Sequence, residues 1–198
     1  MPSSQPPIVC IFICKSNSAR SIVAECVARS RFKELCPSYA TCDCSIPLEF
    51  FSAGVAASDA RAIKTGVIGA LGRAGYSLEG LRSKAISDLL LELQERRVGY
   101  VVTLCCEAEV VLRSNPSLQA SLTQRAAPVI GLNHISVQLV GPAEACRKAG
   151  LAEDAKEGEV HYDELVVSAE KFIARLPDLL RGATPLVPSA PSPDAAPA

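Results

Sequence analysis

The octapeptide CKSNSARS, residues 14–21, brings a thiol, a guanidinium and several short polar side chains into one segment. An apolar, β-branched run at residues 8–13 precedes it, and apolar residues at helical spacing follow it. The chain therefore has to turn from a strand into a helix here. At such a turn several backbone N–H groups point into one concave site beside a helix N-terminus, and such a site binds tetrahedral oxyanions.

Within this loop, Cys14 is the candidate nucleophile, because a thiol in the positive potential of converging amides is expected to ionise to a thiolate. Arg20 can donate two parallel hydrogen bonds to the bound anion. Ser21 can donate a hydroxyl hydrogen bond to the thiolate, and Asn17 tolerates a left-handed backbone. The alternative is a buried cysteine beside an ordinary helix cap, but the whole pattern favours function. The predicted oxyanion-binding residues are Lys15, Ser16, Asn17, Ser18, Ala19 and Arg20.

The surrounding elements predict an α/β fold in three layers, with a four-stranded parallel sheet flanked by helices. Strands are expected at residues 8–13, 50–54, 98–104 and 128–139, and helices at 18–35, 60–74, 87–97 and 162–180. A polar segment after residue 104 is expected to be irregular. We expect one domain over 8–182, a flexible start at 1–7, a Cys-rich loop insertion at 36–49, and a disordered Pro/Ala-rich tail at 183–198.

Composition excludes several classes of function. A net charge of −1 gives no reason to expect nucleic acid or a membrane surface as a partner, and no apolar run is long enough to span a bilayer. Nine cysteines in a chain of this length favour a reducing, cytoplasmic location. Cys36, Cys42 and Cys44 could form half of a metal site, but no partner ligands complete it. A thiol-rich loop without metal is therefore the preferred interpretation.

CKSNSARS resembles the anion-binding loop of the low-molecular-weight protein tyrosine phosphatase superfamily, and most of all its thioredoxin- or glutaredoxin-coupled arsenate reductases. FFSAG at 50–54 and GYSLEGLRSKAISDL at 75–89 resemble two further segments of that family. The resemblance covers about residues 8–180. It implies a four-stranded parallel sheet flanked by helices, an arsenate or phosphate oxyanion as substrate, and no bound cofactor.

Cys105 and Cys106 close the third predicted strand. Strand ends are where α/β sheets place their ligands, and consecutive side chains alternate, so at least one thiol should project toward the loop. The resemblance implies that a second cysteine attacks the Cys14 adduct, releases arsenite and leaves a disulfide. Thioredoxin, or glutathione with glutaredoxin, would then reduce this disulfide. Cys105 is preferred over Cys106 in this role; Leu112 stands near the place where some relatives carry a third cysteine.

One departure from the family pattern keeps alternatives open. The phosphatases carry an Asp-Pro pair whose Asp protonates the leaving phenolate, and Gly141 stands at that position in QLVGPAEA. A phenolate gains about 10²–10⁴-fold from a positioned acid, whereas arsenite release can be driven by thiol attack. An arsenate reductase is therefore the leading prediction. The alternatives are a tyrosine phosphatase acting through a phosphocysteine, or a non-catalytic oxyanion-binding relative.

Overall fold

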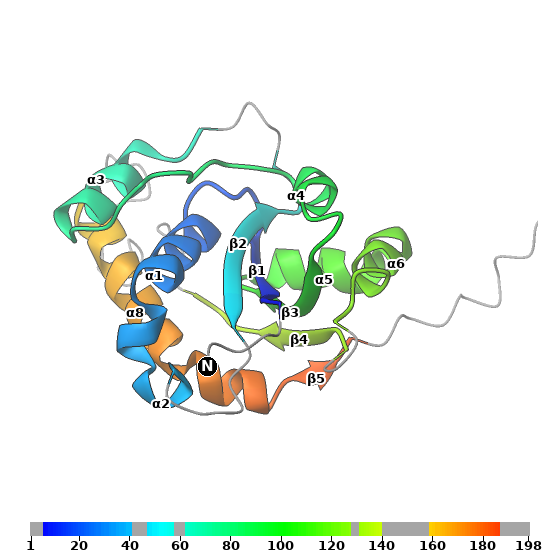
Figure 1. The fold of residues 1–198 in the computed structure, drawn as a ribbon. Helices are drawn as coiled ribbons and strands as arrows, with labels where there is room; N and C mark the ends of the chain where they lie inside the picture. The colour runs from blue at the N-terminus through cyan, green and yellow to red at the C-terminus, as the bar shows by residue number, and fades with distance from the viewer. Residues whose placement is uncertain (1–5, 41–46, 58–61, 128–130, 140–158, 187–198) are drawn as a thin grey trace, which may run out of the picture.

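The computed structural model describes residues 6–40, 47–57, 62–127, 131–139 and 159–186. A five-stranded sheet in the order β2-β1-β3-β4-β5 lies at its centre (Figure 1). The first four strands are parallel, as predicted, and the short fifth strand is antiparallel to β4. The strands are β1 (Ile8–Cys14), β2 (Leu48–Gly54), β3 (Arg97–Thr103), β4 (Asn133–Ser136) and β5 (Thr184–Pro185).

Helices cover the sheet and complete an α/β sandwich (Figure 1). Helix α1 packs against β1, β2 and α8, and α8 also packs against α3, while α5 packs against β1 and β3. Helix α4 lies beside β2. The helices are α1 (Arg20–Leu35), α2 (Pro37–Ala40), α3 (Thr65–Arg73), α4 (Ile86–Glu92), α5 (Cys106–Ser114), α6 (Pro116–Thr123) and α8 (Glu159–Arg181).

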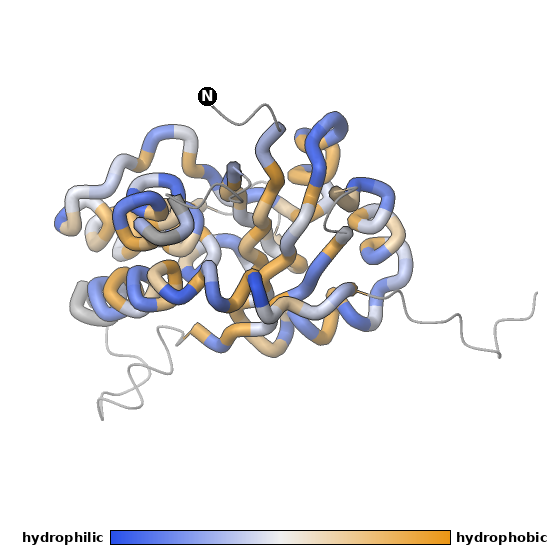
Figure 2. The backbone as a smooth tube through the Cα atoms, turned by 60° about the horizontal axis from the view of Figure 1, so that its bottom comes forward, coloured by the Kyte–Doolittle hydropathy of each residue, from blue (hydrophilic) through white to orange (hydrophobic). Residues whose placement is uncertain are grey.

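Strand β1 forms the middle of the hydrophobic core and is buried along its whole length. Its Phe12 ring stacks on Phe50 of β2 and meets Phe172 of α8 edge-on, with both ring centroids 5.9 Å away. Figure 2 shows the central strands as predominantly hydrophobic and the helices as alternating between apolar and polar residues. A strand that must be apolar on both faces explains why residues 8–13 carry no polar side chain.

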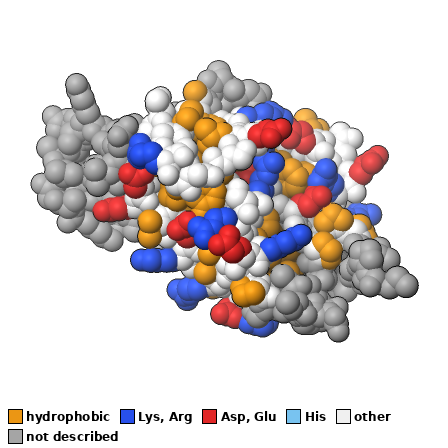
Figure 3. Space-filling view, turned by 60° about the vertical axis from the view of Figure 1, so that its left-hand side comes forward, with side chains coloured by type: hydrophobic (Ala, Val, Ile, Leu, Met, Phe, Trp, Pro, Cys, Tyr) orange, Lys and Arg blue, Asp and Glu red, His pale blue; other side chains and the backbone are white. Residues whose placement is uncertain are grey.

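The outer surface carries charges of both signs beside one another (Figure 3). Arg31 of α1 pairs with Glu34 on the same helix and with Glu170 of α8, at 2.7 and 2.8 Å. Within the part of the chain that the structure describes, no helix is both long and apolar enough to cross a membrane.

The prediction was wrong for the segment after Leu104, which forms α5 and α6 instead of an irregular loop. Helix α5 buries only Ala108 and Leu112, so its apolar pattern is sparse and easily taken for a loop. Helix α6 begins with Asn115 as its N-cap, whose side chain accepts a hydrogen bond from the Leu118 N–H at 3.0 Å.

Two further differences concern the predicted irregular regions. The insertion at 36–49 contains the short helix α2 and the first residues of β2, and residues 41–46 lie outside the described part of the chain. The predicted disordered tail begins with β5, because the Leu186 N–H donates to the Leu132 carbonyl at 2.9 Å and Thr184 pairs with His134. Residues 184–185 form a strand because they pair with the edge of β4, and their Pro/Ala-rich composition alone does not predict this pairing.

Candidate active site

The predicted loop connects the carboxyl end of β1 to the start of α1. Cys14 is the last residue of β1 and Arg20 is the first of α1, so residues 15–19 form the loop. Asn17 has φ 48°, the left-handed conformation for which its residue type is suited. Cys14 is 2% exposed and its Sγ lies 2.9 Å from the Ser21 Oγ, which is itself fully buried. The candidate nucleophile and its hydroxyl partner are thus both buried.

The carboxyl end of β2 supports the loop from below. The N–H groups of Val55 and Ala56 donate to the carbonyls of Cys14 and Lys15 at 3.1 and 2.8 Å. Gly54 pairs with Cys14 in the sheet, and a Cβ added there would lie 2.8 Å from the Asn17 N and the Ser16 carbonyl carbon. Only glycine therefore lets the loop backbone approach this closely, which is the physical reason for the glycine of FFSAG.

A buried chain of hydrogen bonds determines which way the Ser21 hydroxyl points. The Asn17 Nδ2 donates to both Ser21 Oγ and Ser52 Oγ, each at 2.9 Å. The Asn17 Oδ1 accepts the Lys84 N–H at 2.7 Å, which fixes the orientation of the amide. Because Ser21 Oγ accepts from Asn17, its own proton is free to point at Cys14. The arrangement can therefore stabilise a thiolate.

This chain of hydrogen bonds ends at the buried carboxylate of Glu25. The Ser52 hydroxyl donates to Glu25 Oε2 at 2.6 Å, and the Lys84 ammonium lies 3.9 Å from the same oxygen. The side chains of Glu25 and Lys84 are 1% and 4% exposed, and Arg29 reaches the other carboxylate oxygen at 3.3 Å. Burial raises the pKa of Glu25, while Lys84, the Ser52 hydrogen bond and Arg29 oppose that rise. A carboxylate can only accept hydrogen bonds, so it compels Ser52 to act as donor to it and acceptor from Asn17.

Sequence reasoning missed Glu25, Ser52 and Lys84 as contributors to this site. A signal existed for Glu25, because it is the only charged residue in the apolar run SIVAECVA. A charge there is expected to be buried and paired. Its partners come from β2 and from the loop before α4, and nothing in a single sequence reveals that pairing. The resemblance did point to the segment LRSKAIS, whose Lys84 contacts Asn17.

The structure separates the two vicinal cysteines. Cys105 is 1% exposed, whereas the neighbouring Cys106 is exposed at the start of α5 and donates to the Glu107 carboxylate at 3.3 Å. The Leu104 N–H donates to the Ile13 carbonyl at 2.8 Å, so the chain carrying Cys105 runs beside the end of β1. Burial raises the pKa of the Cys105 thiol, the Arg20 guanidinium lowers it, and a negative charge on Cys14 raises it. Cys105 therefore follows a residue that is hydrogen-bonded to the neighbour of Cys14.

The remaining predicted features fall in different places. Leu112 is fully buried on α5, where it packs in the core. Gly141, and Cys42 and Cys44 of the insertion, lie outside the described residues. Cys36 is buried, and its thiol donates to the Ile173 carbonyl of α8 at 3.2 Å.

Comparison with known proteins places the chain in a family. The model of the low molecular weight phosphotyrosine protein phosphatases matches residues 9–125, which include the loop, Gly54, Lys84 and both vicinal cysteines. The chain belongs to this family. Its members are enzymes that use a catalytic cysteine. A comparison with curated protein sequences found no match.

Several solved structures are similar to this chain. A low molecular weight protein tyrosine phosphatase from T. tengcongensis is 16% identical, with 86% of this chain and 98% of the other covered and a TM-score of 0.52. The YwlE arginine phosphatase from Geobacillus stearothermophilus is 15% identical, with 89% and 94% covered and a TM-score of 0.52. A thioredoxin-dependent arsenate reductase from Corynebacterium glutamicum is 17% identical, with 90% and 64% covered and a TM-score of 0.49. At 15–16% identity the first two likenesses show the fold and do not assign a substrate.

Proposed function

We propose that this family member is an arsenate reductase in which Cys14 is the nucleophile and Cys105 is the resolving thiol. The observation that carries the proposal is the position of Cys105: a buried thiol directly after Leu104, whose N–H donates to the carbonyl of Ile13, the residue before Cys14. A phosphatase needs no second thiol at this place. Neighbouring parallel strands lie about 4.8 Å apart and a disulfide requires Cα atoms about 4.4–6.8 Å apart, so adjacent strand ends suit a disulfide.

The first step uses the loop. The amides of residues 15–19 and the Arg20 guanidinium hold arsenate, and the Cys14 thiolate attacks the arsenic. One arsenate oxygen takes up protons and leaves as water, and the product is a Cys14 Sγ–As(V) bond. Ser21 stabilises the attacking sulfur through the 2.9 Å contact.

The second step uses Cys105. Its thiol loses a proton and its sulfur attacks the Cys14 Sγ, forming a disulfide. The S–As bond breaks, its electron pair stays on arsenic, and As(V) becomes As(III), which leaves as arsenite after protonation. Burial is the main cause that raises the pKa of Cys105, and Arg20 beside it opposes that rise.

An external thiol reductant closes the cycle by reducing the disulfide, either thioredoxin or glutathione with glutaredoxin. Both are systems of the cytoplasm, so the proposal includes a cytoplasmic location. Cys14 and Cys105 are buried, whereas Cys106 is the exposed thiol at this end of the sheet in the described chain. Cys106 remains the alternative resolving residue.

A phosphatase is the second candidate, because the loop with Cys14, Arg20 and Ser21 is sufficient in itself to form a phosphocysteine. The matching family model also bears that name. Gly141, where the resemblance implies an acid, argues against efficient cleavage of aryl phosphates. A non-catalytic oxyanion-binding protein is the third candidate, because Gly141 stands where the resemblance implies the acid.

The deciding experiment compares arsenite release and phosphoester cleavage in the wild type and in Cys14→Ser, Cys105→Ser and Cys106→Ser. Cys14→Ser should lose both reactions and still bind arsenate, because the amides and Arg20 remain. Cys105→Ser should lose arsenite release and keep phosphoester cleavage within about twofold, since only the former needs a second thiol. Cys106→Ser is the matched control, with the same substitution one residue away.

Mass spectrometry after one turnover should find a disulfide between Cys14 and Cys105. Arsenate reduction by Cys105→Ser at the wild-type rate would remove the resolving role from this residue. Phosphoester cleavage without arsenate reduction under either reductant would assign the chain to the phosphatases. Oxyanion binding without either reaction would support the non-catalytic alternative.

A further inference from the structure

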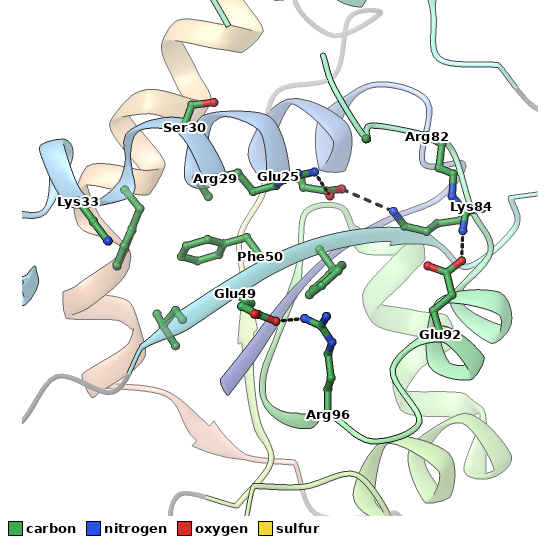
Figure 4. A pocket seen from close by; sticks show the side chains of 15 residues that line it. Glu25, Arg29, Ser30, Lys33, Glu49, Phe50, Arg82, Lys84, Glu92 and Arg96 are labelled. Carbon is green, nitrogen blue, oxygen red and sulfur yellow. Dashed lines mark hydrogen bonds and ion pairs between the residues drawn. The ribbon is translucent and has the colours of Figure 1, made fainter. Parts of the chain in front are cut away.

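A second hollow lies at the free edge of β2, and none of the loop residues 15–19 lines it. It has a volume of about 620 Å³ and is bounded by α1, β2 and the segment 80–96. Figure 4 shows side chains from these three elements around it. Leu48 and Phe50 line it from one face of the sheet, and Glu49 and Phe51 line it from the other. The hollow therefore wraps around the edge of the strand and occupies the place where a further strand of the sheet would lie.

Within the described residues, the backbone of β2 presents groups to this hollow that pair with no other segment. Since the Ile8 N–H donates to the Pro47 carbonyl, the odd-numbered residues of β2 point their backbone groups at β1. The even-numbered residues point theirs outward; of these, Leu48 and Phe50 line the hollow, whereas Ser52 is fully buried. At the end of the strand the outward Gly54 N–H is already taken by the Lys84 carbonyl at 3.0 Å, and Gly54 forms a parallel bridge with Ala85. This edge therefore accepts a neighbouring backbone at Gly54, and the slot before it follows residues 48–51, a length of about 13 Å.

The walls of the slot carry more positive than negative charge. Five cationic side chains line it against three carboxylates: Arg29, Lys33, Arg82, Lys84 and Arg96, with Glu25, Glu49 and Glu92. Glu25 pairs with Arg29 and Lys84, Glu49 pairs with Arg96, and Glu92 pairs with Arg82. Among the described residues Lys33 has no carboxylate partner in an ion pair. An acidic occupant would meet this excess, and a basic occupant would be repelled.

We propose that this slot is a docking site for an extended acidic peptide of a partner protein, which adds to the sheet as a strand beside β2. Backbone hydrogen bonds to Leu48 and Phe50 provide affinity, and Lys33 and its cationic neighbours select acidic side chains. The site is independent of the chemistry proposed for Cys14 and would serve an arsenate reductase or a phosphatase alike.

The test uses the full-length protein and a fluorescein-labelled peptide of about seven residues that alternates Glu and Val, with phosphate present to occupy the catalytic loop. Fluorescence anisotropy should show saturable binding, while the same peptide with Lys in place of Glu should not bind. Two further peptides carry N-methyl groups on alternate residues in the two possible registers. One register should bind about tenfold more weakly or worse, because it loses the donors facing β2, and the other should bind normally.

Lys33→Glu should weaken binding of the acidic peptide at least about fivefold, since it reverses one charge at the slot. Lys171→Glu is the matched control: it reverses an exposed charge on α8 that lies by β4, at the opposite side of the sheet. Equal affinity of the two lysine variants, equal affinity of both N-methyl registers, or no binding of the acidic peptide would each overturn the proposal. A dimer in sedimentation that Lys33→Glu dissociates would assign the slot to a second copy of this chain instead.

Discussion

The substitution Gly54→Ala tests whether contact with β2 fixes the position of the loop at residues 15–19. Gly54 stands opposite Cys14 in the sheet, and the only atom that the substitution adds is a Cβ. This Cβ would lie 2.8 Å from the Asn17 N, the Ser16 carbonyl carbon and the Ala57 Cβ. The first two are backbone atoms of the loop, so a side-chain rotation cannot relieve the clash.

The distances give the size of the effect. Ordinary van der Waals contact begins at 3.4 Å, so the loop has to move by about 0.6 Å. Inserting a methyl group into a packed site costs about 1–3 kcal/mol of unfolding free energy. A displacement of about 1 Å at reacting atoms can cost about 10²-fold in rate, so about 0.6 Å should reduce turnover about tenfold or more. The same shift would lengthen the hydrogen bonds of Asn17 that orient Ser21.

The measurements are turnover on arsenate and on a phosphoester, oxyanion affinity, and urea unfolding. Gly72→Ala is the matched control, because an added Cβ in α3 has no neighbour within 4 Å. It should leave turnover unchanged and stabilise the fold by about 0.5–1 kcal/mol. If Gly54→Ala keeps turnover within twofold of the wild type, the loop is not held by contact with β2 and the reasoning fails.

Two further predictions concern buried charges outside the loop. Lys84→Met should destabilise the fold by about 3–5 kcal/mol, because it leaves the Glu25 carboxylate buried without its ammonium partner. In urea unfolding, the double variant Lys84→Met with Glu25→Gln should recover most of that loss. If the unfolding free-energy changes of the two single variants simply add in the double variant, the two residues do not act as a pair. Burial and the Glu170 carboxylate raise the pKa of Tyr76 to about 12, so the stability that this group contributes is present below pH 10 and is lost as the pH rises through 12. Tyr76→Phe should therefore lose less unfolding free energy than the wild type between pH 9.5 and pH 11.5, and equal slopes would show that Tyr76 is not the group responsible.

The sequence was sufficient to predict the sheet and the loop for a physical reason. A fully buried parallel strand needs a continuous apolar run, and residues 8–13 are such a run. The loop could be placed because its residue types are those that a strand-to-helix turn around an anion requires. Cys14, Ser21 and Asn17 accordingly lie where the spacing predicted, within one hydrogen-bonded group.

The partners of the loop could not be predicted in the same way. Ser52 and Lys84 are 35 and 67 residues from Asn17 in the chain, and each is an ordinary polar residue in its local context. Helices α5 and α6 were missed because tertiary packing and the Asn115 cap stabilise them, whereas their apolar faces are narrow. The pattern of residues in one segment predicts the structure of that segment only. The partners of the loop and the helices α5 and α6 depend on contacts between segments that are distant in the chain.

The order of the strands explains why a nucleophile in this fold can acquire a second thiol without losing its loop. Strand β1 lies between β2 and β3, and all three strands run parallel, so their carboxyl ends meet at one edge of the sheet. On the β2 side Gly54 has to remain without a side chain, because the loop backbone occupies that space. On the β3 side the chain turns away into α5, so Cys105 can carry a thiol there without displacing the loop. A second thiol therefore fits at the end of β3, whereas a cysteine in place of Gly54 would displace the loop backbone.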